Sequence, residues 1–367
     1  MLNLFTEEHS NKTPIPLSEI SDEEVIKELK ALKEELIPKH LVLGHHYQSN
    51  EVIQFADETG DSLALAKKAA SIEKPYITFC GVHFMAETAD MLTNDDQKVI
   101  LPDLNAGCSM ADMANNEQVE KAWKFFSNCT KDKITPITYI NCTAELKAFV
   151  GNHGGAICTS SNAKKIIEWA FKQGQKLLFF PDQHLGRNTC FDMGISLEEM
   201  VVYNPNMLNG GLTPEQVEKA KVILWYGYCS VHQGFTKEQV EQLKNDRPDV
   251  QVIVHPECSF DVVQASHDNG STSYIINKIE AASPGSKFAV GTEINLVNRL
   301  AERFKDKEIF SLSPYQCLCT TMYRVRPRWL LASLLAIKED KPINVIKVSK
   351  EIREPSLIAL ERMLSIS

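Results

Sequence analysis

The chain of 367 residues carries a net charge of −9, and 43% of its residues are hydrophobic and 24% charged. This length exceeds one small domain and allows two or three α/β cores, and the composition is that of a folded globular protein, not of a disordered or collagen-like one. The acidic balance disfavours nucleic acid as a partner, because a phosphate backbone needs a basic face.

The start of the chain predicts neither secretion nor membrane insertion. No basic segment followed by an apolar one opens the sequence, and no run of about 18 apolar residues occurs in it. The ten cysteines are widely spaced, and many lie inside strand-like runs, which is typical of a reducing compartment. We therefore expect a cytoplasmic protein without a membrane partner.

Residues 22–39 carry apolar side chains at helical spacing behind an Asp, which predicts an amphipathic helix. A pattern with a period of roughly 100 residues then occurs three times. In each repeat a β-branched run ends in a polar cluster, a helical stretch follows, and two further apolar runs end in small or polar residues. The first runs lie at 41–48, 134–148 and 250–263, the second at 76–87, 155–166 and 271–279, and the third at 98–107, 176–187 and 287–300.

Strands that alternate with helices predict right-handed βαβ crossovers and short parallel sheets covered on both faces. Ligands gather at the carboxyl ends of such strands. The polar clusters follow the apolar runs, so we expect three α/β layers to bring them to one central pocket. The segment between Arg187 and Glu218 is rich in Asn, Gly and Pro and interrupts the pattern, which indicates an insertion near 188–218.

These patterns divide the chain into three similar units. We expect residues 1–108 plus 320–367 to form the first, 109–229 with the insertion the second, and 230–319 the third. Two amphipathic helices after Pro327 are expected to pack back on the first unit. A Pro-Asp pair after two of the third runs, at 102–103 and 181–182, supports a duplication.

Cys108, Cys229 and Cys319 each follow an apolar run and lie 121 and 90 residues apart (229 − 108 and 319 − 229). Buried core thiols are one interpretation. The shared position beyond strand ends favours a metal centre with three thiolate ligands. Zinc sites commonly use CxxC pairs, which the chain lacks, whereas thiolates alone suit an iron-sulfur cluster. Three ligands would leave one iron open as a Lewis acid, and Cys317 competes with Cys319 for the third place.

Titratable side chains follow the same runs. His255 and Glu257 form either a surface turn or a proton-transfer pair. Five further candidates hold comparable places, and three hydroxyl-rich turns either cap helices or hold carboxylate or phosphate through backbone N–H groups. These are His232, three residues after Cys229; His45 and Tyr47; Tyr139 and Asn141; the turns at 159–162 and 270–272; and the Asp61-Ser62 cap. No GxxxxGK[ST] or GxGxxG motif indicates a nucleotide site.

With these residues in view, the chain resembles the bacterial quinolinate synthase family of NAD biosynthesis, in the long form of quinolinate synthetase A. The resemblance covers nearly the whole sequence, through the ordered motifs HHYQ, GDSL, AGCSMAD, YINCTAE, CTSSNA, FPDQHLGR, GYCSVH, HPEC, GST and CLCTTM. It implies three αβα units around a pseudo-threefold axis, with the active site at the centre. It also implies a 4Fe-4S cluster with one open iron, held by Cys108, Cys229 and Cys319.

The activity that the resemblance implies is that of a transferase. It condenses iminoaspartate with dihydroxyacetone phosphate to give quinolinate, phosphate and water, and a functional link to an aspartate-oxidising enzyme follows. The resemblance is also compatible with a homodimer. The substrate-binding positions carry over to His45, Ser62, Tyr139, Asn141, Ser160, His232, His255, Glu257 and Thr272, and the catalytic roles are expected for Glu257, His255, Tyr47 and Tyr139. The second His of HHYQ, His46, and the insertion depart from the family pattern.

Two other functions fit the same residues. An aconitase-like hydro-lyase would use an open iron on another hydroxy acid. A non-enzymatic iron-sulfur sensor or electron carrier would need a fully ligated cluster and no acid-base residues around it.

Overall fold

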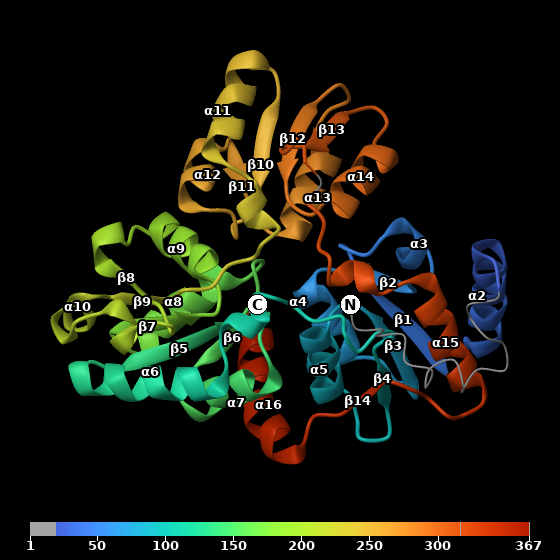
Figure 1. Cartoon of the computed structure of the whole chain (residues 1–367), viewed down its shortest axis with the longest axis horizontal. Coiled ribbons are helices and arrows are strands. Elements are labelled where there is room, and N and C mark those ends of the chain that lie inside the picture. Colours follow the sequence, from blue (N-terminus) through green and yellow to red (C-terminus); the bar gives the residue numbers. More distant parts are fainter. Residues whose placement is uncertain (1–19, 316, 367) are drawn as a thin grey trace. The chain divides into compact units, whose positions relative to one another are not determined.

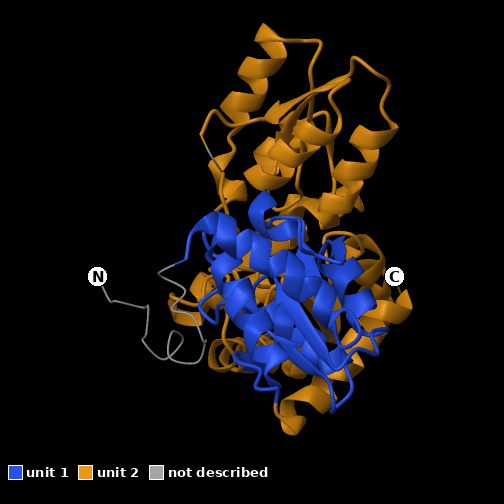
Figure 2. Ribbon diagram, turned by 90° about the vertical axis from the view of Figure 1, so that its right-hand side faces the viewer, with its two compact units in different colours: residues 1–107, 320–348 blue, residues 108–319, 349–367 orange. Residues whose placement is uncertain are grey.

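The computed structural model describes residues 20–315 and 317–366, so the polar start of the chain, residues 1–19, lies outside the described residues. The chain packs into two compact units, which Figure 2 shows in different colours. One consists of residues 1–107 and 320–348, and the other of 108–319 and 349–367. The three-unit boundaries expected from the sequence stay a prediction. No helix within the described ranges is long and apolar enough to cross a membrane.

The first unit contains a five-stranded sheet in the order β14-β4-β3-β1-β2 (Figure 1). Neighbouring strands are parallel, except that β14 runs antiparallel to β4. The strands are β1 (His40–His45), β2 (Glu58–Gly60), β3 (Tyr76–Cys80), β4 (Lys98–Ile100) and β14 (Val345–Ile346). The helices are α2 (Asp22–Leu36), α3 (Asn50–Ile53), α4 (Ser62–Ala69), α5 (His83–Leu92), the 3-10 turn η5 (Met322–Arg324) and α15 (Pro327–Lys338).

Helix α2 confirms the amphipathic helix predicted over residues 22–39. Ser21 begins it with a capping box, in which its hydroxyl accepts from the Glu24 N–H and the Glu24 carboxylate accepts from the Ser21 N–H. Its apolar face is buried in the same cluster as α15. Burial of each such side chain contributes roughly 1.5–3 kcal/mol, against about 0–1 kcal/mol for an exposed ion pair such as Lys338 with Glu35. Apolar packing therefore holds the two helices together.

The second unit contains two sheets, and every neighbouring pair of strands in them is parallel. The sheet in the order β6-β5-β7-β9-β8 comes first in the chain. Its strands are β5 (Ile134–Tyr139), β6 (Ala156–Cys158), β7 (Lys176–Phe180), β8 (Met200–Tyr203) and β9 (Val222–Trp225). Its helices and 3-10 turns are η1 (Ala111–Met113), α6 (Asn116–Cys129), α7 (Ala144–Asn152), α8 (Ala163–Gln173), α9 (Gln183–Asp192), η2 (Leu197–Glu199), η3 (Leu208–Gly211) and α10 (Pro214–Lys219).

The other sheet of this unit has the order β11-β10-β12-β13. Its strands are β10 (Gln251–Val254), β11 (Asp268–Asn269), β12 (Lys287–Gly291) and β13 (Glu308–Ser311). Its helices and turns are η4 (His232–Gly234), α11 (Lys237–Asp246), α12 (Phe260–Ala265), α13 (Thr272–Ala281) and α14 (Ile294–Arg303). Helix α16 (Lys350–Ile366) ends the described chain.

The three sheets repeat one topology. When four strands of each sheet are numbered in chain order, their spatial order is second, first, third, fourth: β2-β1-β3-β4, β6-β5-β7-β9 and β11-β10-β12-β13. The α/β fold with three similar units of short parallel sheets is therefore confirmed. Strand β8, from the predicted insertion, adds an edge to the middle sheet by pairing parallel with β9.

Three details of the predicted repeat are wrong. The run at 271–279 is helix α13, because the Ser271 side chain caps it and Ile275 and Ile279 share one buried face. The run at 76–80 is a third strand instead of a second, since the short β2 precedes it. The two Pro-Asp pairs are consequently not equivalent: Pro102 follows a fourth strand, and Pro181 follows a third.

The two C-terminal helices separate. Helix α15 packs against α2 in the first unit, as expected, but α16 belongs to the second unit and packs against α7. Ser356 donates from its hydroxyl to the carbonyl oxygen of Ala144 at 3.0 Å. A Cβ on Gly151 would lie 1.9 Å from the Pro355 carbonyl oxygen, so the two backbones touch there. Most residues of α7 are buried, and α16 covers part of the α7 surface.

Candidate functional site

Three cysteines occupy the same local position in the three repeats. Each follows the fourth strand of its sheet, precedes a 3-10 turn by three residues (111 − 108, 232 − 229 and 322 − 319) and precedes the next helix by eight (116 − 108, 237 − 229 and 327 − 319). They are Cys108 after β4, Cys229 after β9 and Cys319 after β13. The strand-end position predicted from the sequence therefore has a structural counterpart in each repeat.

The three thiols come together within the second unit. Burial raises the pKa of Cys108 to about 12, and the negative charge of Cys319 adds to this shift. The pKa of Cys229 is raised well above its usual range by burial, with contributions from Glu257, Cys319 and Cys108. Backbone N–H groups of Met110 and Ala111 hydrogen bond to the Cys108 sulfur. Mutually interacting thiols with N–H···S hydrogen bonds fit the donor set of an iron-sulfur cluster.

Cys317, the competitor for the third position, lies elsewhere. Its side chain is buried in the apolar cluster of the third sheet, together with Val231 and Cys258. The Ser313 hydroxyl hydrogen bonds to its sulfur. Cys319 only partly joins that cluster and has the electrostatic contacts with Cys108 and Cys229. The surroundings therefore favour Cys319 as the third ligand.

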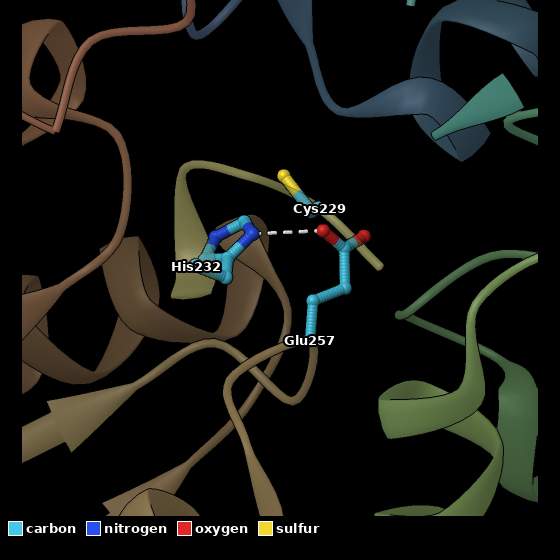
Figure 3. A group of neighbouring side chains, drawn as sticks. All are labelled: Cys229, His232 and Glu257. Atoms are coloured by element: carbon cyan, nitrogen blue, oxygen red, sulfur yellow. Dashed lines mark ion pairs between the residues drawn. The ribbon is translucent and has the colours of Figure 1, made fainter. Parts of the chain in front are cut away.

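Glu257 lies beside the thiols and is almost completely buried. Figure 3 shows its carboxylate facing His232 and the Cys229 sulfur, and the His232 Nδ1 atom lies 2.8 Å from Glu257 Oε2. Burial alone would raise the pKa of Glu257, but the charges of His255 and His232 and the hydrogen bonds from His232 and Tyr139 outweigh it and lower the pKa. Glu257 is therefore a buried carboxylate anion.

Two histidines share this carboxylate. The rings of His232 and His255 are stacked, with centroids 4.5 Å apart and an interplanar angle of 21°. His255 Nδ1 lies 4.0 Å from Glu257 Oε2, and His255 Nε2 lies 3.2 Å from the Ser160 hydroxyl. His232 Nε2 lies 3.2 Å from the Thr292 hydroxyl. The group therefore brings two imidazoles and a carboxylate together, which are side chains able to transfer protons.

Cys229, His232 and Glu257 also satisfy the geometry of a single-ion site. Their three ligand atoms all lie within 4.8 Å of one another. Because Cys229 and Glu257 take part in this group and in the contacts described above, the candidate metal ligands and the candidate acid-base residues adjoin each other (Figure 3).

Other predicted residues of the second unit follow its first and second strands. Tyr139 ends β5 and is buried. Asn141 Oδ1 is buried and has no hydrogen-bond partner among the described residues. Ser160 follows β6, and Thr272 begins α13, whose N-terminal N–H groups point toward its start. Each predicted position therefore lies close to a strand end or a helix start.

His45, Tyr47 and Ser62 belong to the first unit. The His45 and Tyr47 rings meet edge to face with centroids 4.8 Å apart, and the Tyr47 N–H donates to His45 Nδ1 at 3.1 Å. Ser62 begins α4, and the preceding Asp61 caps this helix by accepting from the Ala64 N–H at 2.9 Å. The three residues hold the first-strand and second-strand positions of their own sheet.

The sequence analysis missed two buried carboxyl groups that follow third strands. Asp182, after β7, caps α9 through Oδ1, while Oδ2 has no hydrogen-bond partner among the described residues. Burial and the charge of Glu257 raise the pKa of Asp182 well above its usual range. Glu293, after β12, accepts from the Cys319 N–H at 3.4 Å and from the Asn295 N–H at 2.8 Å. Burial raises the pKa of Glu293 to about 7.

The signal that could have found these two groups is position. His45 and Tyr139 end first strands and His255 follows one, Ser62, Ser160 and Thr272 follow second strands, and the cysteines follow fourth strands. The ends of the third strands were the one class of strand end to which no candidate residue had been assigned. The Pro-Asp and Gly-Thr-Glu sequences after β7 and β12 supply the buried acids there.

Comparison with known proteins agrees with these features. A sequence model of the family described as Quinolinate synthetase A protein matches residues 27–365. A quinolinate synthase of Anoxybacillus flavithermus is 54% identical over 353 residues, which cover 96% of each chain. A quinolinate synthase of Bacillus subtilis is 53% identical over 355 residues, again 96% of each chain, and one of Bacillus cereus is 53% identical over 347 residues, 94% of each. The chain belongs to the quinolinate synthetase A family.

Proposed function

We propose that this protein is an enzyme of NAD biosynthesis, a transferase that condenses iminoaspartate with dihydroxyacetone phosphate to give quinolinate, phosphate and water. The observation that carries the proposal is the meeting of Glu257, two imidazoles and three thiols within one compact unit. The family relationship supports it, since the relatives over nearly the whole chain are quinolinate synthases.

Cys108, Cys229 and Cys319 would hold a 4Fe-4S cluster, because thiolates are its usual ligands and these thiols interact with one another. When bound through only three cysteines, such a cluster supplies a Lewis-acidic iron that helps a hydroxyl group to leave. The backbone N–H groups of Met110, Ala111 and His232 stabilise the sulfur anions that ligation requires.

Glu257 is the general base in this proposal. Its lowered pKa keeps it ionised, so its carboxylate can accept a proton from the substrate, and the His232 Nδ1–H, 2.8 Å from Oε2, stabilises the anion. The Tyr139 hydroxyl donates to the Glu257 carboxylate and orients it. His255 holds the Ser160 hydroxyl at 3.2 Å from Nε2, which directs this donor toward a substrate oxygen.

Substrate recognition follows from the remaining groups. Thr272 begins a ten-residue helix, and such a helix start attracts carboxylate or phosphate. Asn141 presents the buried Oδ1 that has no hydrogen-bond partner in the described part of the chain, and the N–H of an imine can donate to this oxygen. In the first unit, His45 and Ser62 are proposed as substrate-binding residues and Tyr47 as a proton-transfer residue.

The direct test is an anaerobic assay of quinolinate formation from iminoaspartate and dihydroxyacetone phosphate with protein that carries its full complement of iron and sulfide. We expect quinolinate and inorganic phosphate in equal amounts. A protein with the intact cluster that forms no quinolinate would contradict the proposed activity and leave the hydro-lyase and sensor alternatives.

The ligand assignment has a matched pair of variants in one short segment. Cys319→Ser should lose the cluster, because the hydroxyl that replaces the thiol is a poor iron ligand. Cys317→Ser should keep it, because Cys317 is buried in the apolar cluster of the third sheet. Iron and acid-labile sulfide per chain and the visible absorption of the cluster are the measurements. The reverse pattern would make Cys317 the ligand.

A further inference from the structure

Three consecutive carbonyl oxygens of the loop that carries Glu257 accept hydrogen bonds from side-chain amides. Asn188 Nδ2 donates to the oxygens of Pro256 and Cys258, each at 2.9 Å. Gln233 Nε2 donates to the oxygen of Glu257 at 3.2 Å. The backbone of this loop is therefore held from outside on both sides of the carboxylate-bearing residue.

Asn188 comes from a different sheet than the loop that it holds. It lies on α9, which follows β7, whereas residues 255–258 follow β10 of the other sheet in the same compact unit. The two layers also touch through Phe191 of α9 and Phe260 of α12, whose ring centroids lie 4.8 Å apart. Asn188 thus joins the loop to a helix of the layer that supplies Tyr139 and Ser160.

The orientation of the Asn188 amide is determined by its surroundings. The side chain is fully buried, both Nδ2 hydrogens are used, and Oδ1 has no hydrogen-bond partner within the described residues. A flipped amide would direct Oδ1 at two carbonyl oxygens, which is repulsive. Asn188 therefore directs two donors at the loop and leaves one buried acceptor without a hydrogen bond. Buried polar atoms without a partner are unusual, and a side chain that only fills space would not need one.

We propose that Asn188, assisted by Gln233, is a positioning residue that sets the place of Glu257 and His255 relative to Tyr139 and Ser160. The contacts that depend on this placement are the Tyr139 hydrogen bond to Glu257 and the 3.2 Å contact of His255 with Ser160. Both cross from one layer to the other. This role rests on the proposed function of Glu257 and His255, and it requires no contact between Asn188 and substrate.

The test is Asn188→Leu, which keeps the size of the side chain and removes both donors. Its matched control is Gln97→Leu in the other compact unit, because Gln97 Nε2 is also buried and donates to two carbonyl oxygens, those of Ile72 and Lys74. Both variants should melt at a lower temperature than the parent. Only Asn188→Leu should lower kcat, by about 100-fold, since a displacement of about 1 Å can have this effect, while KM changes little.

Two further measurements separate positioning from a general loss of stability. Amide hydrogen exchange should become faster at residues 255–260 in Asn188→Leu, with unchanged iron and sulfide content, and should stay unchanged there in Gln97→Leu. Gln233→Leu should lower kcat as well, and the double variant should lose less than the product of the two single losses, because both side chains hold one loop.

Equal kcat values for Asn188→Leu and Gln97→Leu, or a loss of activity that follows the loss of iron alone, would overturn the proposal. If Asn188→Leu does not fold, Asn188→Ser and Gln233→Leu answer the same question through kcat and hydrogen exchange. A parent protein that makes no quinolinate would refute the proposed function, and the exchange of residues 255–260 would still test whether Asn188 holds this loop.

Discussion

At the scale of single residues, the chemistry of the site depends on neighbours more than on residue type. Two carboxyl groups near each other have opposite shifts: contacts with imidazoles and a phenol lower the pKa of Glu257, whereas burial and the charge of Glu257 raise the pKa of Asp182. The motif HPEC identifies the first acid from sequence. The state of the second depends on burial, which no single motif reveals.

His40, in the first unit, offers a test of a pKa shift whose largest cause is burial. It begins β1, is nearly inaccessible, and its Nε2 lies 2.8 Å from the Thr78 hydroxyl. Burial lowers the pKa of His40 to about 4, against about 6.5 in the unfolded chain. The unfolded state therefore binds more protons between these values, so the contribution of His40 to stability is complete above pH 6.5. It is lost by up to about 3 kcal/mol as the pH falls toward 4.

His40→Gln should flatten this dependence, because an amide can still meet the Thr78 hydroxyl but does not titrate. The measurement is the free energy of unfolding in urea at several pH values between 7 and 4.5. His83→Gln is the matched control, since the His83 side chain is exposed. An equally steep acid limb in His40→Gln would show that other groups account for the loss of stability.

At the scale of elements, the long strands and helices could be predicted from sequence and the short ones could not. The runs that became β1, β5, β7 and β12 form strands of five or six residues, long enough to show a pattern. Strand β11 has two residues and β2 three, and they are formed by pairing with β10 and β1. Such short segments become strands only because a neighbouring strand pairs with them. The strands that come after them were therefore given the wrong position in the predicted repeat.

The packing of α16 on α7 gives the element-scale prediction. Gly151→Ala should destabilise the protein by about 1–3 kcal/mol, because the new Cβ would lie 1.9 Å from the Pro355 carbonyl oxygen and the helices would have to separate. At an exposed helical position the same change would instead stabilise by about 1 kcal/mol. The sign of the change in unfolding free energy therefore decides whether the helices touch. Asn152→Ala, exposed on the same helix, should have little effect.

At the scale of the whole molecule, the order of elements along the chain explains why the first unit is discontinuous. Each cysteine is followed after eight residues by the helix that opens a new group of elements, and for Cys319 this helix is α15, which returns to the first sheet. The sequence allowed this return to be predicted from the amphipathic pattern after Pro327. The sequence did not predict that α16 packs on the second unit, because an apolar helical face does not indicate which sheet it covers.

A fragment experiment tests this return. Residues 1–107 alone should not fold cooperatively, since α2 would expose the apolar face that packs with Leu330, Leu331 and Leu334 of α15. Each of these side chains contributes roughly 1.5–3 kcal/mol by burial, which is a large share of the usual stability of a domain. Joining residues 1–107 to 320–348 through a short Gly-Ser linker restores the partner helix and β14.

The joined fragment should show a sigmoidal urea transition and helical circular dichroism, and the fragment 1–107 should show neither. Leu331→Asp in the joined fragment is the matched variant, because it places a charge in the apolar cluster and should abolish the transition. Cooperative folding of residues 1–107 without α15 would mean that the first unit is complete before the chain returns. Helix α15 would then cover a domain that is already complete.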